Sequence, residues 1–235
     1  MTSLSILSGG AAQGLVASLT PKFKEQTGLD IAGEFGAVGA MADKLRGGTS
    51  ADIVVLTAAL IADLAREKLV ATSSISDIGR VETALAVRDA DPLVSAPDAP
   101  SLRAALLAAD AIFVPDTKVS TAGIHVAKIL RQLGIAEEVA PRLEVYPNGA
   151  IAMRHLAESK AKQPIGCTQT TEIIATSGVR LSASLPQGCD LSSVYTAAVT
   201  TTAAHAREAQ ILTDLLTSQE QSELRTRAGF LDARN

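Results

Sequence analysis

Leu4-Ser5-Ile6-Leu7-Ser8-Gly9-Gly10-Ala11-Ala12 is a short apolar run that ends in small residues, and an amphipathic segment follows it. Short apolar runs bounded by glycine are typical of buried strands. From Leu15 to Phe23 apolar residues recur at helical spacing, which indicates one face that packs on a sheet. We therefore predict a strand over residues 4–7 and a helix over 12–27, the beginning of a βαβ unit.

The same alternation of strand-like runs and helical patterns continues along the chain. It predicts a mainly parallel sheet with right-handed crossovers. The further strands that we predict cover residues 31–35, 53–56, 80–87, 111–114, 143–146, 165–168 and 194–200. The further helices cover residues 41–45, 60–65, 122–133, 150–161, 204–216 and 218–228, with a short helix after residue 168.

The pattern restarts midway through the chain instead of extending one series. We therefore predict an α/β fold of two lobes, each a mainly parallel sheet flanked by helices. Residues 1–81 plus 196–235 form lobe 1, and residues 82–195 form lobe 2. The chain then crosses between the lobes twice, near Val81-Glu82-Thr83 and near Tyr195-Thr196.

The amino-acid composition indicates which kinds of partner the protein does not bind. Of 235 residues, 47% are hydrophobic, 3% are aromatic and none is tryptophan, and the net charge is −4. Nucleic-acid binding needs a basic surface and stacking side chains, so we expect no nucleic-acid partner. No run approaches the roughly 20 apolar residues of a membrane-spanning helix, so we expect no membrane insertion.

The N-terminus shows no basic region, long apolar region or cleavage site of a secretory signal. We expect a cytoplasmic protein as written, or a periplasmic one if a signal segment has been removed. Cys167 and Cys189 are the only cysteines, and we expect them to remain buried thiols. The three histidines and two cysteines have no zinc-site spacing, so we expect no metal and no cofactor.

Four junctions between a predicted strand and the next helix are rich in small or hydroxylated residues. In parallel α/β sheets, ligands bind beyond the carboxyl ends of strands, where free amides of the first helical turn attract anions. Glycine also lets a ligand approach the main chain. No phosphate-loop or complete dinucleotide motif is present, so nucleotide binding is not favoured. The junctions are Ser8-Gly9-Gly10-Ala11-Ala12, Gly36-Ala37-Val38-Gly39-Ala40, Val119-Ser120-Thr121-Ala122-Gly123 and Thr168-Gln169-Thr170-Thr171-Glu172.

Several stretches together resemble the molybdate-binding-protein family of ABC-transporter substrate-binding proteins. Besides the first junction, they are Phe35-Gly36-Ala37-Val38-Gly39-Ala40-Met41, Ala51-Asp52-Ile53-Val54-Val55-Leu56, Ala122-Gly123-Ile124-His125, Arg131-Gln132-Leu133-Gly134-Ile135 and Ile165-Gly166-Cys167-Thr168-Gln169-Thr170-Thr171-Glu172-Ile173. The similarity covers nearly the whole chain. It implies the type II periplasmic-binding-protein fold, with the ligand in a cleft between the lobes.

The resemblance departs from the family where molybdate is held. Family members assist the amides with hydroxyls after the first two strands and with a tyrosine in the second lobe. The matching positions here are Ala11, Ala37–Gly39 and Gln169. Each lost hydrogen bond removes about 0.5–1.5 kcal/mol, so we expect an anion other than molybdate. The Thr168-Gln169-x-x-Glu172 junction resembles a divergent branch of the family that includes aconitate isomerase.

The expected ligand-binding residues come from all four junctions. Several hydroxyls, such as Ser8 and Ser120, have an alternative role as helix or turn caps. Lys118, Arg80 and Arg154 are further candidates for a carboxylate, although each also suits an exposed solvated or ion-paired position. The predicted ligand-binding residues are Ser8, Gly9, Gly10, Ala11, Ala37, Val38, Gly39, Ser120, Thr121, Ala122, Gly123, Gln169 and Thr170.

Two functions follow from this pattern. The first is a binding protein for a small oxyanion or a di- or tricarboxylate, with an ABC permease as partner if the protein is exported. The alternative is a cytosolic isomerase of an unsaturated polycarboxylate such as aconitate. In that case Glu172, His125 and Lys118, in this order, are the acid–base candidates. Glu172 instead suits a helix N-terminus, and His125 a helix surface.

Overall fold

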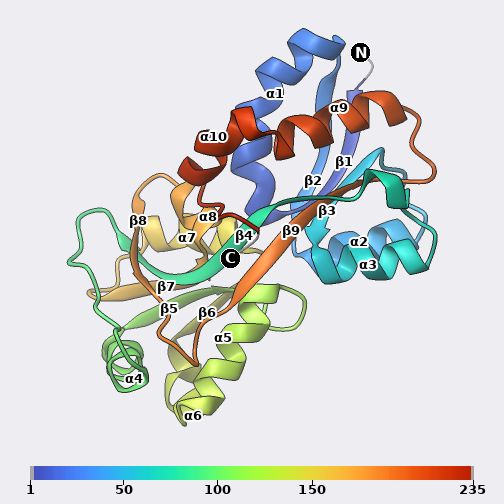
Figure 1. The fold of residues 1–235 in the computed structure, drawn as a ribbon. Helices are drawn as coiled ribbons and strands as arrows, with labels where there is room; N and C mark the ends of the chain where they lie inside the picture. The colour runs from blue at the N-terminus through green and yellow to red at the C-terminus, as the bar shows by residue number, and fades with distance from the viewer. Residues whose placement is uncertain (1–2, 234–235) are drawn as a thin grey trace. The chain divides into compact units, whose positions relative to one another are not determined.

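The structure is a computed structural model that describes residues 3–233 (Figure 1). The predicted ends of lobe 1, residues 1–2 and 234–235, lie outside the described residues. The chain divides into two compact units. Unit 1 combines the chain up to Val81 with the chain from Ser193 onward, and unit 2 is Glu82–Ser192.

Unit 1 is built around three parallel strands. β1 (Ser3–Gly9) pairs with β2 (Asp30–Gly36) on one side and with β3 (Ile53–Thr57) on the other. β9 (Ser192–Val199) is antiparallel to β3. β1 and β3 are almost entirely buried, because helices cover both faces of these strands.

The helices of unit 1 follow from the apolar spacing of the sequence. The predicted face of α1, including Leu15 and Phe23, is buried. α1 contacts α9, and α2 contacts α3, and the two pairs lie on different sides of β1–β3 (Figure 1). The helical elements are η1 (Gly10–Ala12), α1 (Gln13–Thr27), α2 (Val38–Arg46), α3 (Ala58–Arg66), η2 (Thr72–Ser74), α9 (Ala206–Thr217), η4 (Gln219–Gln221) and α10 (Ser222–Arg227).

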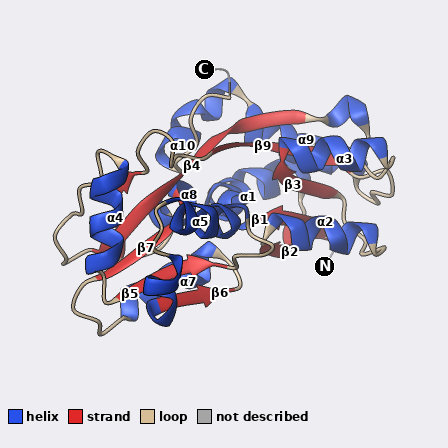
Figure 2. Cartoon of the chain, turned by 90° about the horizontal axis from the view of Figure 1, so that it is seen from below, coloured by secondary structure: helices blue, strands red, loops and turns tan. Residues whose placement is uncertain are grey.

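The strands of unit 2 pair with one another, and its apolar side chains form clusters separate from that of unit 1. β5 is parallel to β6 and β7, and β4 is antiparallel to β7 and β8. Figure 2 shows the helices of this unit along the strands β7, β5 and β6. The strands are β4 (Ser76–Arg88), β5 (Ala111–Pro115), β6 (Leu143–Tyr146), β7 (Pro164–Gln169) and β8 (Val179–Ser184). The helices are α4 (Ala99–Ala108), α5 (Thr121–Gln132), α6 (Ala136–Val139), η3 (Ala140–Arg142), α7 (Gly149–Glu158) and α8 (Thr170–Ile174).

The sequence prediction omits several elements, and part of the sheet is antiparallel. α4, α6, β8 and the short turns η2 and η3 were not predicted. β4, β8 and β9 are antiparallel to their neighbours, whereas the other strands form two parallel sets as expected. β4 and β9 are the segments within which the chain passes from one unit to the other.

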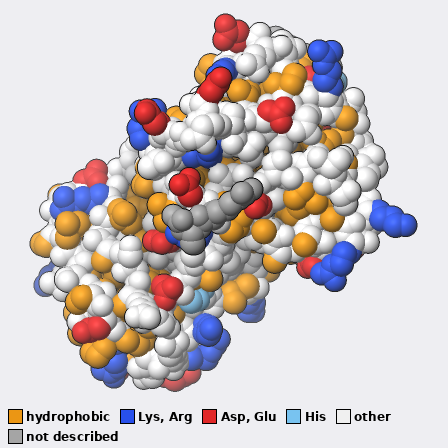
Figure 3. All heavy atoms as spheres, in the orientation of Figure 1, with side chains coloured by type: hydrophobic (Ala, Val, Ile, Leu, Met, Phe, Trp, Pro, Cys, Tyr) orange, Lys and Arg blue, Asp and Glu red, His pale blue; other side chains and the backbone are white. Residues whose placement is uncertain are grey.

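The remaining sequence expectations concern cysteines, membranes and surface charge. Cys167 and Cys189 are both buried and free, as expected. Among the described helices, none has the length and apolar character to cross a membrane. On the face shown in Figure 3, acidic and basic side chains are interspersed with apolar ones.

Candidate functional site

The carboxyl ends of the three parallel strands of unit 1 lie on one edge, and each leads into a helical segment. The N-cap residues there are Gly9 before η1, Ala37 before α2 and Thr57 before α3. None of the three makes a side-chain cap hydrogen bond. Amides of the first turn are therefore left without side-chain acceptors at three adjacent positions.

The predicted residues of unit 1 lie together on this edge. Gly9 and Gly36 are paired in adjacent strands, so the first two junctions are neighbours. The hydroxyl of Ser8 is buried and donates to the Gly9 carbonyl at 2.9 Å, which supports its role in the turn. A Cβ at Gly9 would lie 2.6 Å from Val38 Cγ1 and 2.9 Å from Tyr195 Cε1. Only glycine fits this position.

Two residues of this edge escaped the sequence analysis. Thr57 ends β3 and begins a third junction, and the small residues that follow it were the available signal. Tyr195 is buried and pairs with Thr57 across β3 and β9. Its proximity to Gly9 depends on a strand from the far end of the chain, which no local pattern indicates.

In unit 2 the first junction lies at the start of α5. Ser120 is the N-cap, and its side chain makes no cap hydrogen bond. The turn before it is fixed by Asp116, whose carboxylate accepts hydrogen bonds from the amides of Lys118 at 2.7 Å and Val119 at 3.1 Å. A Cβ at Gly123 would lie 2.2 Å from the Asp116 carbonyl oxygen, so glycine allows α5 to pack on this turn. Thr121, Ala122 and Gly123 form the first turn.

The second junction of unit 2, at the start of α8, contains a buried carboxylate. Thr168 Oγ1 donates to Glu172 Oε2 at 2.6 Å. The carboxylate also accepts hydrogen bonds from the amides of Gln169, Gly149 and Ala150. A Cβ at Gly149 would lie 1.9 Å from Glu172 Oε2. Glu172 thus bonds the N-cap of its own helix, as in a capping box, and also the first turn of α7.

Burial dominates the electrostatics of this carboxylate. Desolvation raises the pKa of Glu172, and the hydrogen bonds from Thr168 and from the amides oppose that rise only in part. Thr171, at the same junction, has a buried hydroxyl that has no hydrogen-bond partner in the described part of the chain. The junction therefore contains both a nearly enclosed carboxyl group and an unsatisfied hydroxyl.

The other acid–base and charged candidates differ in their surroundings. Lys118 is exposed in the loop before α5, and Arg154 is exposed on α7. His125 Nε2 lies 2.9 Å from the Cys189 carbonyl oxygen, which ties the ring to the loop after β8. Arg80 belongs to unit 1 and pairs through its backbone near the end of the chain. The structure therefore does not gather these side chains around one junction of unit 2.

Metal or thiol chemistry finds little support in the described residues. Among residues 3–233, no group of three His, Cys, Asp or Glu side chains is placed to hold a metal ion. Burial raises the pKa of Cys167 to about 12, so its thiol stays protonated at neutral pH. His155 stacks on Tyr146 with ring centroids 4.3 Å apart, and the His205 amide donates to Asp52 Oδ1 at 2.9 Å.

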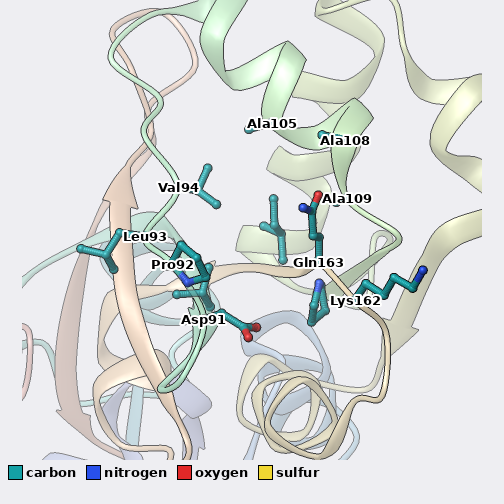
Figure 4. A pocket seen from close by; sticks show the side chains of 12 residues that line it. Asp91, Pro92, Leu93, Val94, Ala105, Ala108, Ala109, Lys162 and Gln163 are labelled. Carbon is teal, nitrogen blue, oxygen red and sulfur yellow. The ribbon is translucent and has the colours of Figure 1, made fainter.

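A separate hollow of about 220 Å³ lies in unit 2 between α4 and the loop after β4 (Figure 4). Its lining includes Ala105, Ala109, Pro164 and Ile165. Pro164 begins β7, whereas the α8 junction follows the end of β7. The hollow is therefore at the opposite edge of the sheet and contains none of the predicted site residues.

Comparisons with known proteins agree with this arrangement. An aconitate isomerase from Pseudomonas sp is 25% identical over 234 residues, which cover 95% of this chain and 85% of that protein. The periplasmic molybdate-binding protein of Azotobacter vinelandii has a TM-score of 0.80 at 15% identity, with 97% of this chain and 99% of that chain covered. The sulfate-binding protein SubI from Mycobacterium tuberculosis H37Rv has a TM-score of 0.73 at 17% identity, with 100% and 88% covered.

These likenesses confirm the predicted type II periplasmic-binding-protein fold. The sequence profile of the bacterial extracellular solute-binding protein family matches residues 4–231, nearly the whole chain. The chain therefore belongs to the bacterial extracellular solute-binding protein family.

Proposed function

We propose that this protein binds a small anion, an oxyanion or a di- or tricarboxylate, through main-chain amides at helix starts. The observation that carries the proposal is the contrast between helix starts. Those of α2, α3 and α5 have no side-chain cap, whereas α7 is capped by Asn148 and Glu172. Uncapped starts at the carboxyl edge of parallel strands are suited to an external anion.

The physical basis is the partial positive charge of a helix N-terminus. Each start presents up to four amides without intrahelical acceptors and about half a positive charge. An anion that accepts hydrogen bonds from several of these amides gains several charge-assisted hydrogen bonds at once. No basic side chain is then needed inside the site, which agrees with the separate positions of Lys118 and Arg154.

The choice of anion rests on the residues beside the amides. The molybdate- and sulfate-binding proteins share this fold, which supports an oxyanion as the ligand class. Ala11 and Gln169 stand where the molybdate-binding family supplies hydroxyls, which favours an anion other than molybdate. The unsatisfied Thr171 hydroxyl offers one donor or acceptor to a larger carboxylate.

Calorimetric titration against sulfate, phosphate, molybdate, tungstate, citrate and cis- and trans-aconitate tests the proposal. We expect one of these anions to bind, and binding to weaken when Ser120→Asp places an internal carboxylate at the start of α5. An aspartate N-cap also contributes about 1 kcal/mol to helix stability, so loss of binding by unfolding is not expected.

Gln221→Asp is the matched control, because Gln221 is the uncapped N-cap of α10, outside the proposed site. It should leave the anion affinity unchanged. Absence of binding to every anion of the panel would contradict the proposal. So would equal affinities of the wild type and the Ser120→Asp variant.

An isomerase of an unsaturated polycarboxylate is the second candidate function. The similarity to an aconitate isomerase from Pseudomonas sp favours it. The reaction removes a proton next to a carboxylate and returns one elsewhere, and helix-start amides are suited to stabilise the enolate-like charge that develops. Because Glu172 is enclosed by four hydrogen-bond donors, we place His125 before it as the first base to test.

Incubation with cis-aconitate, followed by chromatography of trans-aconitate, distinguishes the two functions. Turnover that His125→Gln reduces about 100-fold or more would support the isomerase and this choice of base. Binding of aconitate without turnover would leave the binding function alone. An ABC permease is the partner that we propose in that case.

A further inference from the structure

Glu172 connects two parts of unit 2 that are distant in the sequence. Its carboxylate receives the Gln169 amide from the α8 junction and the Gly149 and Ala150 amides from the start of α7. Gln169 and Thr170 of this junction are among the predicted ligand-binding residues. The position of the junction's backbone relative to α7 therefore depends on one buried side chain.

The Thr168 hydroxyl gives this carboxylate a partner in either protonation state. It donates to Glu172 Oε2 at 2.6 Å when the glutamate is ionised. A hydroxyl also accepts hydrogen bonds, so it is able to accept one from a protonated carboxyl group in the same position. The Thr168 hydroxyl and the Glu172 carboxylate lie close to the backbone of Gly149 in α7, since a Cβ added there would lie only 2.1 Å from Thr168 Oγ1. Neither the hydroxyl nor the carboxylate therefore has space to move toward α7.

Within residues 3–233, no charged side chain is among the hydrogen-bond partners of Glu172 or the main influences on its pKa. α8 packs on α7, β7 and β8. The charged and titratable residues of these elements are exposed, except for the buried thiol of Cys167. They are Arg154, His155 and Glu158 on α7, Cys167 on β7 and Arg180 on β8. The negative charge of Glu172 is thus opposed by hydrogen-bond dipoles alone.

On the basis of the proposed function, we propose that Glu172 is a positioning residue of the anion site and that its carboxylate gains a proton when the anion binds. A second negative charge at the α8 junction raises the free energy of the ionised glutamate. The proton comes from solvent and joins one carboxylate oxygen, and no other bond is made or broken. Burial already raises the pKa of this group, so the change that the anion must cause is small.

Calorimetry in buffers of different ionisation enthalpy measures the protons taken up on binding. Sulfate is the first probe and trans-aconitate the second. We expect wild-type uptake of up to one proton more than Glu172→Gln, since the protonation of the ligand itself cancels in this difference. The wild-type affinity should rise by up to about tenfold per pH unit as the pH falls, and the dependence in Glu172→Gln should be weaker.

One variant separates Glu172 from other titrating groups. Glu158→Gln changes an exposed carboxylate at the end of α7, and its proton uptake should equal that of the wild type. A helix cap without proton coupling would change the stability of Glu172→Gln and leave the number of protons unaltered.

Equal proton uptake by the wild type and Glu172→Gln overturns the inference and leaves the proposed function intact. If Glu172→Gln does not fold, carbon-detected NMR of the wild-type glutamate carboxyls replaces it. A Glu172 titration that is identical with and without bound sulfate or trans-aconitate again overturns the inference. Failure of every anion to bind overturns the proposed function and this inference together.

Discussion

In the described part of the chain, each unit contains one buried carboxylate that accepts amide hydrogen bonds at the start of a helix. The pKa values of the two carboxylates are shifted in opposite directions. Asp52 in unit 1 is 3% exposed, and Glu172 in unit 2 is 6% exposed. Asp52 accepts the Ser5 amide at 2.8 Å, the Ser5 hydroxyl at 2.7 Å and the amide of His205, the N-cap of α9. Glu172 accepts one hydroxyl and three amides.

Similar numbers of hydrogen bonds give opposite results. Desolvation is the largest influence on both groups and raises both pKa values. For Asp52 the hydrogen bonds together outweigh it, so the pKa of Asp52 is lowered. For Glu172 they do not, and the pKa of Glu172 is raised. A buried carboxylate at a helix start is therefore either a fixed charge or a proton acceptor, depending on how completely it is desolvated.

The largest expected effect comes from removing the fixed charge. Asp52→Ala leaves the amides of Ser5 and His205 without an acceptor, and we expect the free energy of unfolding to fall by about 3–5 kcal/mol. Urea unfolding followed by circular dichroism measures it. A loss below about 1 kcal/mol would show that water replaces the carboxylate, and Asp52 would no longer be a structural charge.

A methyl group placed against the second carboxylate should have the next largest effect. Gly149→Ala places Cβ in the space of Glu172 Oε2 and Thr168 Oγ1, and we expect a loss of about 2–3 kcal/mol. The double variant with Glu172→Ala removes the clash with the carboxylate and leaves only the one with Thr168 Oγ1. Its loss should be smaller than the sum of the two single losses, and additive losses would contradict the contact.

The two hydroxyl partners allow a matched comparison. Thr168→Val and Ser5→Ala each remove one hydroxyl donor from a buried carboxylate, and each should cost about 1 kcal/mol of unfolding free energy. Thr168→Val should also raise the pKa of Glu172 further, because the hydroxyl lowers it. A downward shift in a carbon-detected NMR titration would contradict this assignment.

The smallest effect is the pH dependence of stability, and its sign differs between the units. The contribution of Asp52 is present above its unfolded-state pKa and is lost as the pH falls through the lowered folded-state value. The contribution of Glu172 is present below its unfolded-state pKa and is lost as the pH rises through the raised folded-state value. Urea unfolding from about pH 3 to 8 measures the free energy of unfolding as a function of pH. In Asp52→Asn, the fall in this free energy at acidic pH should be smaller than in the wild type. In Glu172→Gln, the fall toward neutral pH should be smaller. Parallel profiles would remove the distinction between the two carboxylates.

Sequence patterns predict the parallel strands of both units well, because β1, β3, β5 and β7 are short, mostly apolar runs in buried positions. β2 and β6 are largely exposed, but they follow the same alternation with helices. α4 escaped prediction because Pro97, Asp98 and Pro100 indicate a turn, although Asp98 is in fact the N-cap and its carboxylate accepts the Ser101 amide. β8 escaped because it has a mostly exposed pattern and is paired with β4 alone. Local propensity cannot indicate a strand whose position depends on one distant neighbour.

The sequence predicts which backbone positions belong to the candidate site. It does not predict the hydrogen bonds that the buried carboxylates make. Glycine and small residues after strands indicate where amides are accessible. The bond between Glu172 and Gly149 joins residues in separate helices, and that between Asp52 and His205 joins residues 153 positions apart. Neither has a spacing signature. The role of Glu172 as a cap was nevertheless one of the two alternatives that the sequence left open.

The passage of the chain between the units within β4 and β9 has a consequence for synthesis on the ribosome. Unit 2 is one continuous stretch, so it is complete while unit 1 still lacks β9. Until β9 emerges, the backbone of β3 has an unpaired edge, although Ile53, Val54, Val55 and Leu56 are wholly buried in the finished protein. An apolar edge of this kind promotes aggregation. The nascent chain must therefore carry its first 81 residues with this edge unpaired until residues 192–199 have been translated.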